Sequence, residues 1–284
     1  MKQAIFVILS VFAFGCNSNS NENKENISKP EEKTDIKFSK QQVKDFKSAA
    51  KVFNALPTPI EMAEIIQKSQ VIYDPELLND DKKTSDYVTT MERALNLGVY
   101  FADLSFTSVF DHPQESVNYL KAAQKIANEL NILDVFNENI TSRMESNMNN
   151  KDSLLGIISE AYLTTDNFLY ENQMHSVSAA VLAGSWIEGL SIATRLRSTN
   201  GESKIIKAKI SEQQASLKNL MGLLKDCKEA ELSQIKGKLT KMEELYSEIK
   251  ISTAADSTKM YEMSDETYRK IASNINNIRT SIVE

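Results

Sequence analysis

The stretch that decides the fold is VLAGSWIEGLSIAT, residues 181–194, in which small and apolar residues surround a single acid, Glu188. On a helix, Glu188 stacks along the axis with Val181, Gly184 and Ile192, so the acid does not lie on a polar stripe. A helix that is apolar on every side is normally enclosed by other helices. The stretch therefore predicts a central helix with one embedded carboxylate.

The same helix carries a second row of small side chains at Ser185, Gly189 and Ala193. Such a row lets a neighbouring helix approach closely. We therefore expect the helix over about Ser176–Arg197 to be packed tightly by its neighbours.

The rest of the chain follows the same helical pattern. Apolar spacings of three and four recur, strand-like alternation is nearly absent, and only 5 prolines and 8 glycines occur in 284 residues. This predicts an all-α protein, a multi-helix array or bundle of about nine to ten helices. Within a helical core over 39–197, we expect helices at about Ser39–Phe53, from Pro59 (with Thr58 and Glu61 as a capping box), and at Ser85–Phe110, Pro113–Asn131, Ile132–Met148, Lys151–Glu171 and Ser176–Arg197.

Residues 203–284 have a different, heptad-like pattern. Three amphipathic segments with polar outer faces predict a helical hairpin and a returning helix, as an extension that packs separately or as one domain with the core. The apolar rows are Ile206, Ile210, Leu217, Leu220 and Leu224; Ile235, Leu239, Met242, Tyr246 and Ile249; and Tyr268, Ile271, Ile275, Ile278 and Ile282.

The N-terminal sequence MKQAIFVILSVFAFGC predicts an export signal. Lys2 precedes an apolar run of signal-peptide length, which ends at Gly15-Cys16. This resembles a bacterial lipobox, and the resemblance implies cleavage before Cys16 and acylation of that residue. An ordinary signal peptide with a chance cysteine is the alternative. We expect a signal peptide over 1–15 and a flexible polar tether over 16–38 behind a membrane anchor.

Charge and cysteine content exclude several classes of protein. The chain has 33 basic and 39 acidic residues, a net charge of −6, without a basic patch. This argues against nucleic acid as a partner. Once Cys16 is acylated, Cys227 has no partner for a disulfide, and its place in an apolar row predicts a small buried hydrophobe.

The embedded acids lie beside aromatic residues. Asp103 is one turn from Tyr100, and Glu160 and Asp166 bracket Tyr162. An isolated buried carboxylate costs several kcal/mol, so each acid must be neutral, paired or hydrogen-bonded.

Two interpretations of these acids follow. In the first, Arg93, Arg143 or Arg195 and tyrosine hydroxyls satisfy the acids in a structural network. In the second, the side chains line a pocket for a cationic or polyhydroxy ligand. The candidate ligand-binding residues are Tyr100, Asp103, Tyr162, Trp186 and Glu188.

Motifs for common chemistry do not occur. His112 and His175 are the only histidines, neither has the Glu-x-x-His spacing, and both are expected at surface or cap positions. The phosphate-binding, dinucleotide-binding and nucleophile-elbow motifs do not occur either. We therefore predict no metal site, no cofactor and no catalytic residues, while a hydrolase using Glu188 and Asp103 stays an alternative.

Five segments, LPTPIEMAEII, ALNLGVYFADLSF, YLKAAQKIANELNI, NKDSLLGIISEAY and VLAGSWIEGLSIAT, resemble a family of uncharacterised all-helical lipoproteins from Bacteroidota-type bacteria. The resemblance covers about residues 55–197 and implies an envelope address and an all-helical fold. We expect a non-enzymatic, lipid-anchored protein at the periplasmic side of the outer membrane, which binds a small ligand or an envelope protein. A scaffold that docks a partner through its C-terminal helices is a further alternative.

Overall fold

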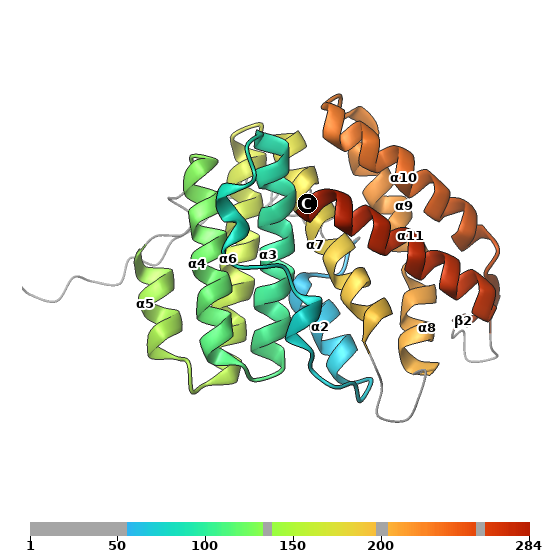
Figure 1. The fold of residues 1–284 in the computed structure, drawn as a ribbon, viewed down its shortest axis with the longest axis horizontal. Helices are drawn as coiled ribbons and strands as arrows, with labels where there is room; N and C mark the ends of the chain where they lie inside the picture. The colour runs from blue at the N-terminus through green and yellow to red at the C-terminus, as the bar shows by residue number, and fades with distance from the viewer. Residues whose placement is uncertain (1–55, 133–137, 197–203, 254–258) are drawn as a thin grey trace, which may run out of the picture. The chain divides into compact units, whose positions relative to one another are not determined.

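The helix α7, His175–Arg195, is enclosed along most of its length, and every residue from Val177 to Ala193 is buried. The computed structural model describes residues 56–132, 138–196, 204–253 and 259–284, all within the compact unit Lys40–Glu284. The predicted signal peptide, the tether, Cys16 and the helix at Ser39–Phe53 lie outside the described residues. The all-α class is confirmed over the described residues (Figure 1).

The elements before α7 reproduce most of the predicted helices. They are α2 (Pro59–Gln67), η1 (Pro75–Leu77), η2 (Lys83–Ser85), α3 (Thr90–Val109), α4 (Pro113–Glu129), α5 (Glu138–Ser146) and α6 (Lys151–Glu171). The helix expected from Ser85 begins later because Thr89 and Glu92 form a capping box in front of Thr90. The predicted box of Thr58 and Glu61 is confirmed at the start of α2.

Left-handed residues end three helices of this half of the chain, α3, α4 and α6. Asp111, Asn131 and Gln173 have φ values of 64°, 58° and 59°. Each is followed by a backbone N–H that bonds a carbonyl five residues back, as from His112 to Thr107 at 2.8 Å. These Schellman motifs close α3, α4 and α6 without glycine.

The closest packing in the described fold joins α7 to α3. A Cβ atom on Gly98 would lie 2.0 Å from the carbonyl oxygen of Val181, and one on Gly184 would lie 1.9 Å from that of Leu95. The two backbones touch here because neither glycine has a side chain. The predicted row of small residues serves two neighbours. A Cβ atom on Gly98 would lie 2.7 Å from the backbone N of Ser185, whereas Gly189 faces Met62 of α2.

The C-terminal part is less regular than its heptad pattern predicts. The elements are α8 (Lys204–Glu212), α9 (Gln214–Leu223), η4 (Leu224–Asp226), α10 (Ala230–Ser247), β1 (Lys250–Thr253), β2 (Lys259–Glu262) and α11 (Asp265–Val283). The first predicted helix is interrupted at Gln213, whose side chain bonds Trp186 of α7. The hairpin of β1 and β2, paired antiparallel with Ile251 opposite Tyr261, was not predicted by the apolar pattern.

The returning helix α11 packs against α7, α10 and α3 (Figure 1). Its apolar row is used inside the fold, because Ile271, Ile275 and Ile278 have no exposed surface. By length and composition α7 would also pass as a membrane span, but nearly all of it is buried within the fold, so its apolar character is that of a core helix.

Candidate functional site

The five side chains predicted to line a ligand pocket are enclosed in the core. Tyr100, Asp103 and Glu188 have no exposed surface, Trp186 has 2% and Tyr162 has 4%. None of the five lines either of the two grooves described below. The structure brings Asp103 and Glu188 into one buried cluster, out of reach of solvent.

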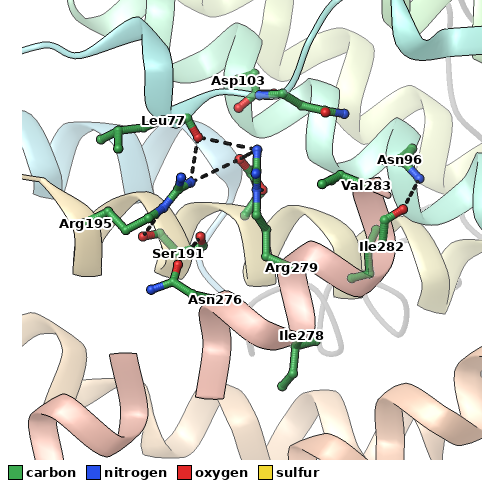
Figure 2. A network of polar contacts seen from close by, with 12 residues as sticks. Leu77, Asn96, Asp103, Ser191, Arg195, Asn276, Ile278, Arg279, Ile282 and Val283 are labelled. Carbon is green, nitrogen blue, oxygen red and sulfur yellow. Dashed lines mark hydrogen bonds and ion pairs between the residues drawn. The ribbon is translucent and has the colours of Figure 1, made fainter. Parts of the chain in front are cut away.

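Glu188 is paired with an arginine from the far end of the chain. Arg279 of α11 donates from Nε to Oε2 at 2.8 Å and from Nη2 to Oε1 at 3.1 Å. Arg195 adds a more distant charge, with its Nη2 4.0 Å from Oε1 of Glu188. Figure 2 shows both guanidinium groups turned toward the carbonyl oxygen of Leu77, which accepts from Nη2 of Arg195 at 2.6 Å.

Asp103 occupies the same cluster, and it forms no direct ion pair with another described residue. Its Oδ2 accepts a hydrogen bond from the backbone N–H of Asn79 at 3.1 Å. Burial and the nearby Glu188 raise the pKa of Asp103 well above its usual value, against the opposing effect of Arg279. Its Oδ1 and the Oδ1 of Asn96 have no hydrogen-bond partner among the described residues.

Tyrosine hydroxyls complete this network by holding the loop before α3. Tyr100 donates to the carbonyl of Asp80 and Tyr119 to that of Asn79, both at 2.9 Å. The side chain of Asn79 in turn donates to the hydroxyl of Tyr87 at 2.9 Å. Burial raises the pKa of Tyr100 and Tyr119, so both stay protonated donors.

The arrangement is that of a structural network, in which Glu188 and the tyrosine hydroxyls bind other groups of the protein. Of the arginines considered from sequence, Arg195 reaches the cluster, whereas Arg93 pairs with Glu129 and Arg143 with Glu160. The main partner, Arg279, was missed. Its position four residues after Ile275, beside the apolar row of α11, is the signal that could have found it.

An open groove lies elsewhere, between the end of α6, the start of α7 and the α9–η4 segment. Its volume is about 560 Å³, within the range of small-molecule sites. We call it the Asp166 groove; its lining residues are Asp166, Tyr170, Gln173, His175, Ser176, Ser178, Ala179, Leu182, Gly222, Leu223, Asp226 and Cys227.

Asp166 is the unusual member of this groove. Only 3% of it is exposed, and Ser178 of α7 donates a short hydrogen bond to its Oδ1. Burial raises its pKa to about 6, which the Ser178 hydroxyl partly opposes. Among the described residues no lysine or arginine forms an ion pair with it. A nearly buried acid without a counter-charge beside an open groove is a feature of binding sites.

The lining of the Asp166 groove also includes aromatic side chains and a cysteine. The rings of Tyr170 and His175 meet edge to face at a centroid distance of 5.1 Å. Cys227 is buried as predicted, its Sγ 3.6 Å from the carbonyl of Leu223, and burial raises the pKa of its thiol. A protonated thiol of this kind is a packing group and a poor nucleophile.

A second groove, of about 710 Å³, runs along α2 beside Leu163 and Glu212. Its carboxylates already have partners in the protein. Glu61 belongs to the capping box of α2, Glu64 pairs with Lys68 and Glu212 with Lys209. This groove therefore has no charged group left to bind a ligand.

No cluster of three or more His, Cys, Asp or Glu side chains that could hold a metal ion occurs within the described ranges. His112 stacks on Tyr73 with a centroid distance of 3.7 Å and contacts Glu115, while His175 lies at the start of α7. Comparisons with protein-family models, with curated proteins and with solved structures found no match to this chain.

Proposed function

We propose that this chain is a lipid-anchored, non-enzymatic binding protein of the cell envelope that holds a small ligand in the Asp166 groove. The observation that carries the proposal is this groove, about 560 Å³ in volume with a nearly buried acid that has no counter-charge among the described residues. Membrane anchoring is supported by the lipobox-like Gly15-Cys16 and the polar stretch that follows it.

Two alternatives are less well supported. A hydrolase using Glu188 and Asp103 needs substrate to reach carboxyl groups that have no exposed surface, one of them in a two-bond ion pair. A scaffold docking through the heptad rows needs those rows at the surface, whereas Leu239 of α10 and Ile275 of α11 are fully buried.

Ligand retention tests the groove. Gly222 lines it, and a Cβ atom there would meet nothing within 4 Å. Gly222→Tyr should therefore fill the groove without disturbing the fold. The matched control is Gly237→Tyr on α10, where a Cβ atom has equally open space outside the groove.

The full chain and both variants are incubated with a small-molecule extract of the envelope, washed, and analysed by native mass spectrometry. We expect the parent chain and the Gly237 variant to retain the same compound and the Gly222 variant to lose it. Equal retention by all three proteins, or no retention by any, would contradict the proposal.

Cys16→Ser tests the anchor, with Cys227→Ser as its control. We expect the first variant to leave the membrane fraction and to lose acyl-chain labelling, and the second to behave as the parent chain. If both variants stay acylated, Cys16 is not the lipidated residue.

A further inference from the structure

We propose that the Asp166 groove binds a small organic cation, an ammonium group on an apolar body, with the Asp166 carboxylate as its counter-charge. This inference rests on the proposed function and specifies its ligand class. It follows from the position of one carboxyl group and from the composition of the surrounding walls.

Asp166 differs from Glu188 in having no charged partner among the described residues. Burying a carboxylate without a cation costs several kcal/mol, so proteins pair such groups or keep them neutral. Glu188 follows this rule through Arg279, whereas Asp166 has the Ser178 hydroxyl and no basic partner among the described residues. An ammonium ion in the groove would supply the counter-charge for Asp166, as Arg279 does for Glu188.

No lysine or arginine faces Asp166 from the described elements that line the groove. The lining residues include no lysine or arginine, and the groups that can change charge are Tyr170 on α6, His175 on α7, and Asp226 and Cys227 on the η4 side. The start of α7 adds a partial positive charge, which stabilises the carboxylate without neutralising it. The described walls therefore disfavour an anionic ligand and favour a cationic one.

The groove also has apolar and aromatic surface for the body of a ligand. Ala179, Leu182 and Leu223 give the groove apolar surface, and Tyr170, which is 45% exposed, offers an aromatic face at the rim. An aromatic face attracts an ammonium group, and it also packs against the apolar surface of a ligand. The combination suits an amine that carries an alkyl or aromatic group, and gives little to a fully hydrated metal ion.

The test uses probes of one shape and different charge. Benzylammonium, benzyl alcohol and benzoate, with butylammonium and butanol as an aliphatic pair, are titrated into the full chain in detergent at about pH 7.5, where Asp166 is mostly ionised. Binding is followed by isothermal calorimetry and by ligand-observed NMR.

We expect the ammonium probes to bind roughly 10- to 100-fold more tightly than the alcohols, as expected for a hydrogen bond to a charged group, and benzoate not to bind. Asp166→Asn should reduce ammonium binding to the level of the alcohols. The control Asp111→Asn changes an exposed aspartate at positive φ, a conformation that asparagine also adopts.

The pH dependence provides a second readout. In the parent chain the affinity for benzylammonium should fall about tenfold for each pH unit below the pKa of Asp166, because protons compete with the probe. In the Asp166→Asn variant it should be flat. His175 also lines the groove, so His175→Gln should leave the fall intact if Asp166 is the responsible group.

The outcomes separate the two proposals. Ammonium binding that persists in Asp166→Asn, or the absence of binding by every ammonium probe, overturns the cation inference. If an envelope compound is nevertheless retained in a Gly222-dependent way, the groove binds a ligand of another class and the proposed function stands. If Gly222→Tyr affects neither the compound nor the probes, both proposals are wrong.

Discussion

Arg279 of α11 and Glu188 of α7 face each other through two hydrogen bonds, of 2.8 Å and 3.1 Å, although 91 residues separate them in the chain. Glu188 has no exposed surface. Burial lowers the pKa of Arg279, but the attraction and hydrogen bonds of Glu188 outweigh that effect and leave it raised. The pair therefore fixes the last helix on the central one.

Replacing Arg279 by Met should destabilise the protein by about 3–5 kcal/mol, because it leaves the buried Glu188 carboxylate without its main counter-charge. The measurement is urea unfolding followed by circular dichroism at neutral pH. The matched control is Arg269→Met, an exposed arginine on the same helix, for which we expect a change within about 0.5 kcal/mol.

A double-mutant cycle checks that the loss comes from the pair. Glu188→Leu alone should also be costly because it leaves Arg279 buried and unpaired, whereas Glu188→Leu with Arg279→Met should recover much of the stability. Strictly additive losses would show that the two residues act independently.

Glu188→Gln should lower stability without changing ligand retention, since Glu188 does not line the Asp166 groove.

Gly98→Ala should destabilise the protein by about 1–3 kcal/mol or more, because the added methyl would force α3 away from the carbonyl of Val181. Gly156→Ala on α6 is the control. A Cβ atom there meets nothing within 4 Å, so that variant should gain roughly 0.5–1 kcal/mol of helix propensity. Thermal unfolding of both variants gives the comparison, and equal effects would refute the close contact of α3 and α7.

The fold was largely predictable because its signals are local. The apolar character of residues 181–194 gives the central helix, and Thr58 with Glu61 marks a helix start by its own hydrogen bonds. The hairpin of β1 and β2 lacks such a signal, because its first strand is exposed at every residue and has no apolar alternation. At the break, the side chain of Gln213 accepts a hydrogen bond from Trp186, and no local pattern encodes a partner so distant in sequence.

The candidate site was predictable only in part. The acids Asp103 and Glu188 were identified as embedded, but the sequence does not show whether an embedded acid faces a cavity or another side chain. The sequence shows Asp166 near Tyr162 but does not show that Asp166 lines a groove. The groove forms only where α9 and η4 meet the end of α6 and the start of α7. Contacts between distant segments decide whether a buried charge has a partner, as the pair of Glu188 and Arg279 shows.

Trp186, the only tryptophan of the chain, should report on the enclosure of α7. It is 2% exposed and its Nε1 donates to Gln213 at 3.2 Å. We expect blue-shifted emission in the native protein, little quenching by acrylamide, and a red shift on unfolding, since the indole then meets water. Native emission at the wavelength of free tryptophan would show that the helix is open to solvent.

Asp166 should make stability depend on pH in a defined direction. Its pKa rises from 3.8 to about 6 on folding, so between these values the folded state holds a proton that the unfolded state has lost. The contribution of Asp166 to the free energy of unfolding is fully present below pH 3.8. It is lost as the pH rises through about 6, and the total loss is about 3 kcal/mol. Asp166→Asn removes this dependence, because the amide stays neutral at every pH.

The difference in unfolding free energy between the parent chain and Asp166→Asn isolates this effect, because Asp103 and the other acids titrate in both proteins. We expect urea unfolding to give the variant its largest relative advantage at about pH 7.5 and its smallest at about pH 3.5. A saturating ammonium ligand should shrink that advantage at the higher pH, since it binds the parent carboxylate and not the amide. A difference that stays constant across this range would mean that Asp166 is solvated in the folded protein, which would remove the basis for a cation site.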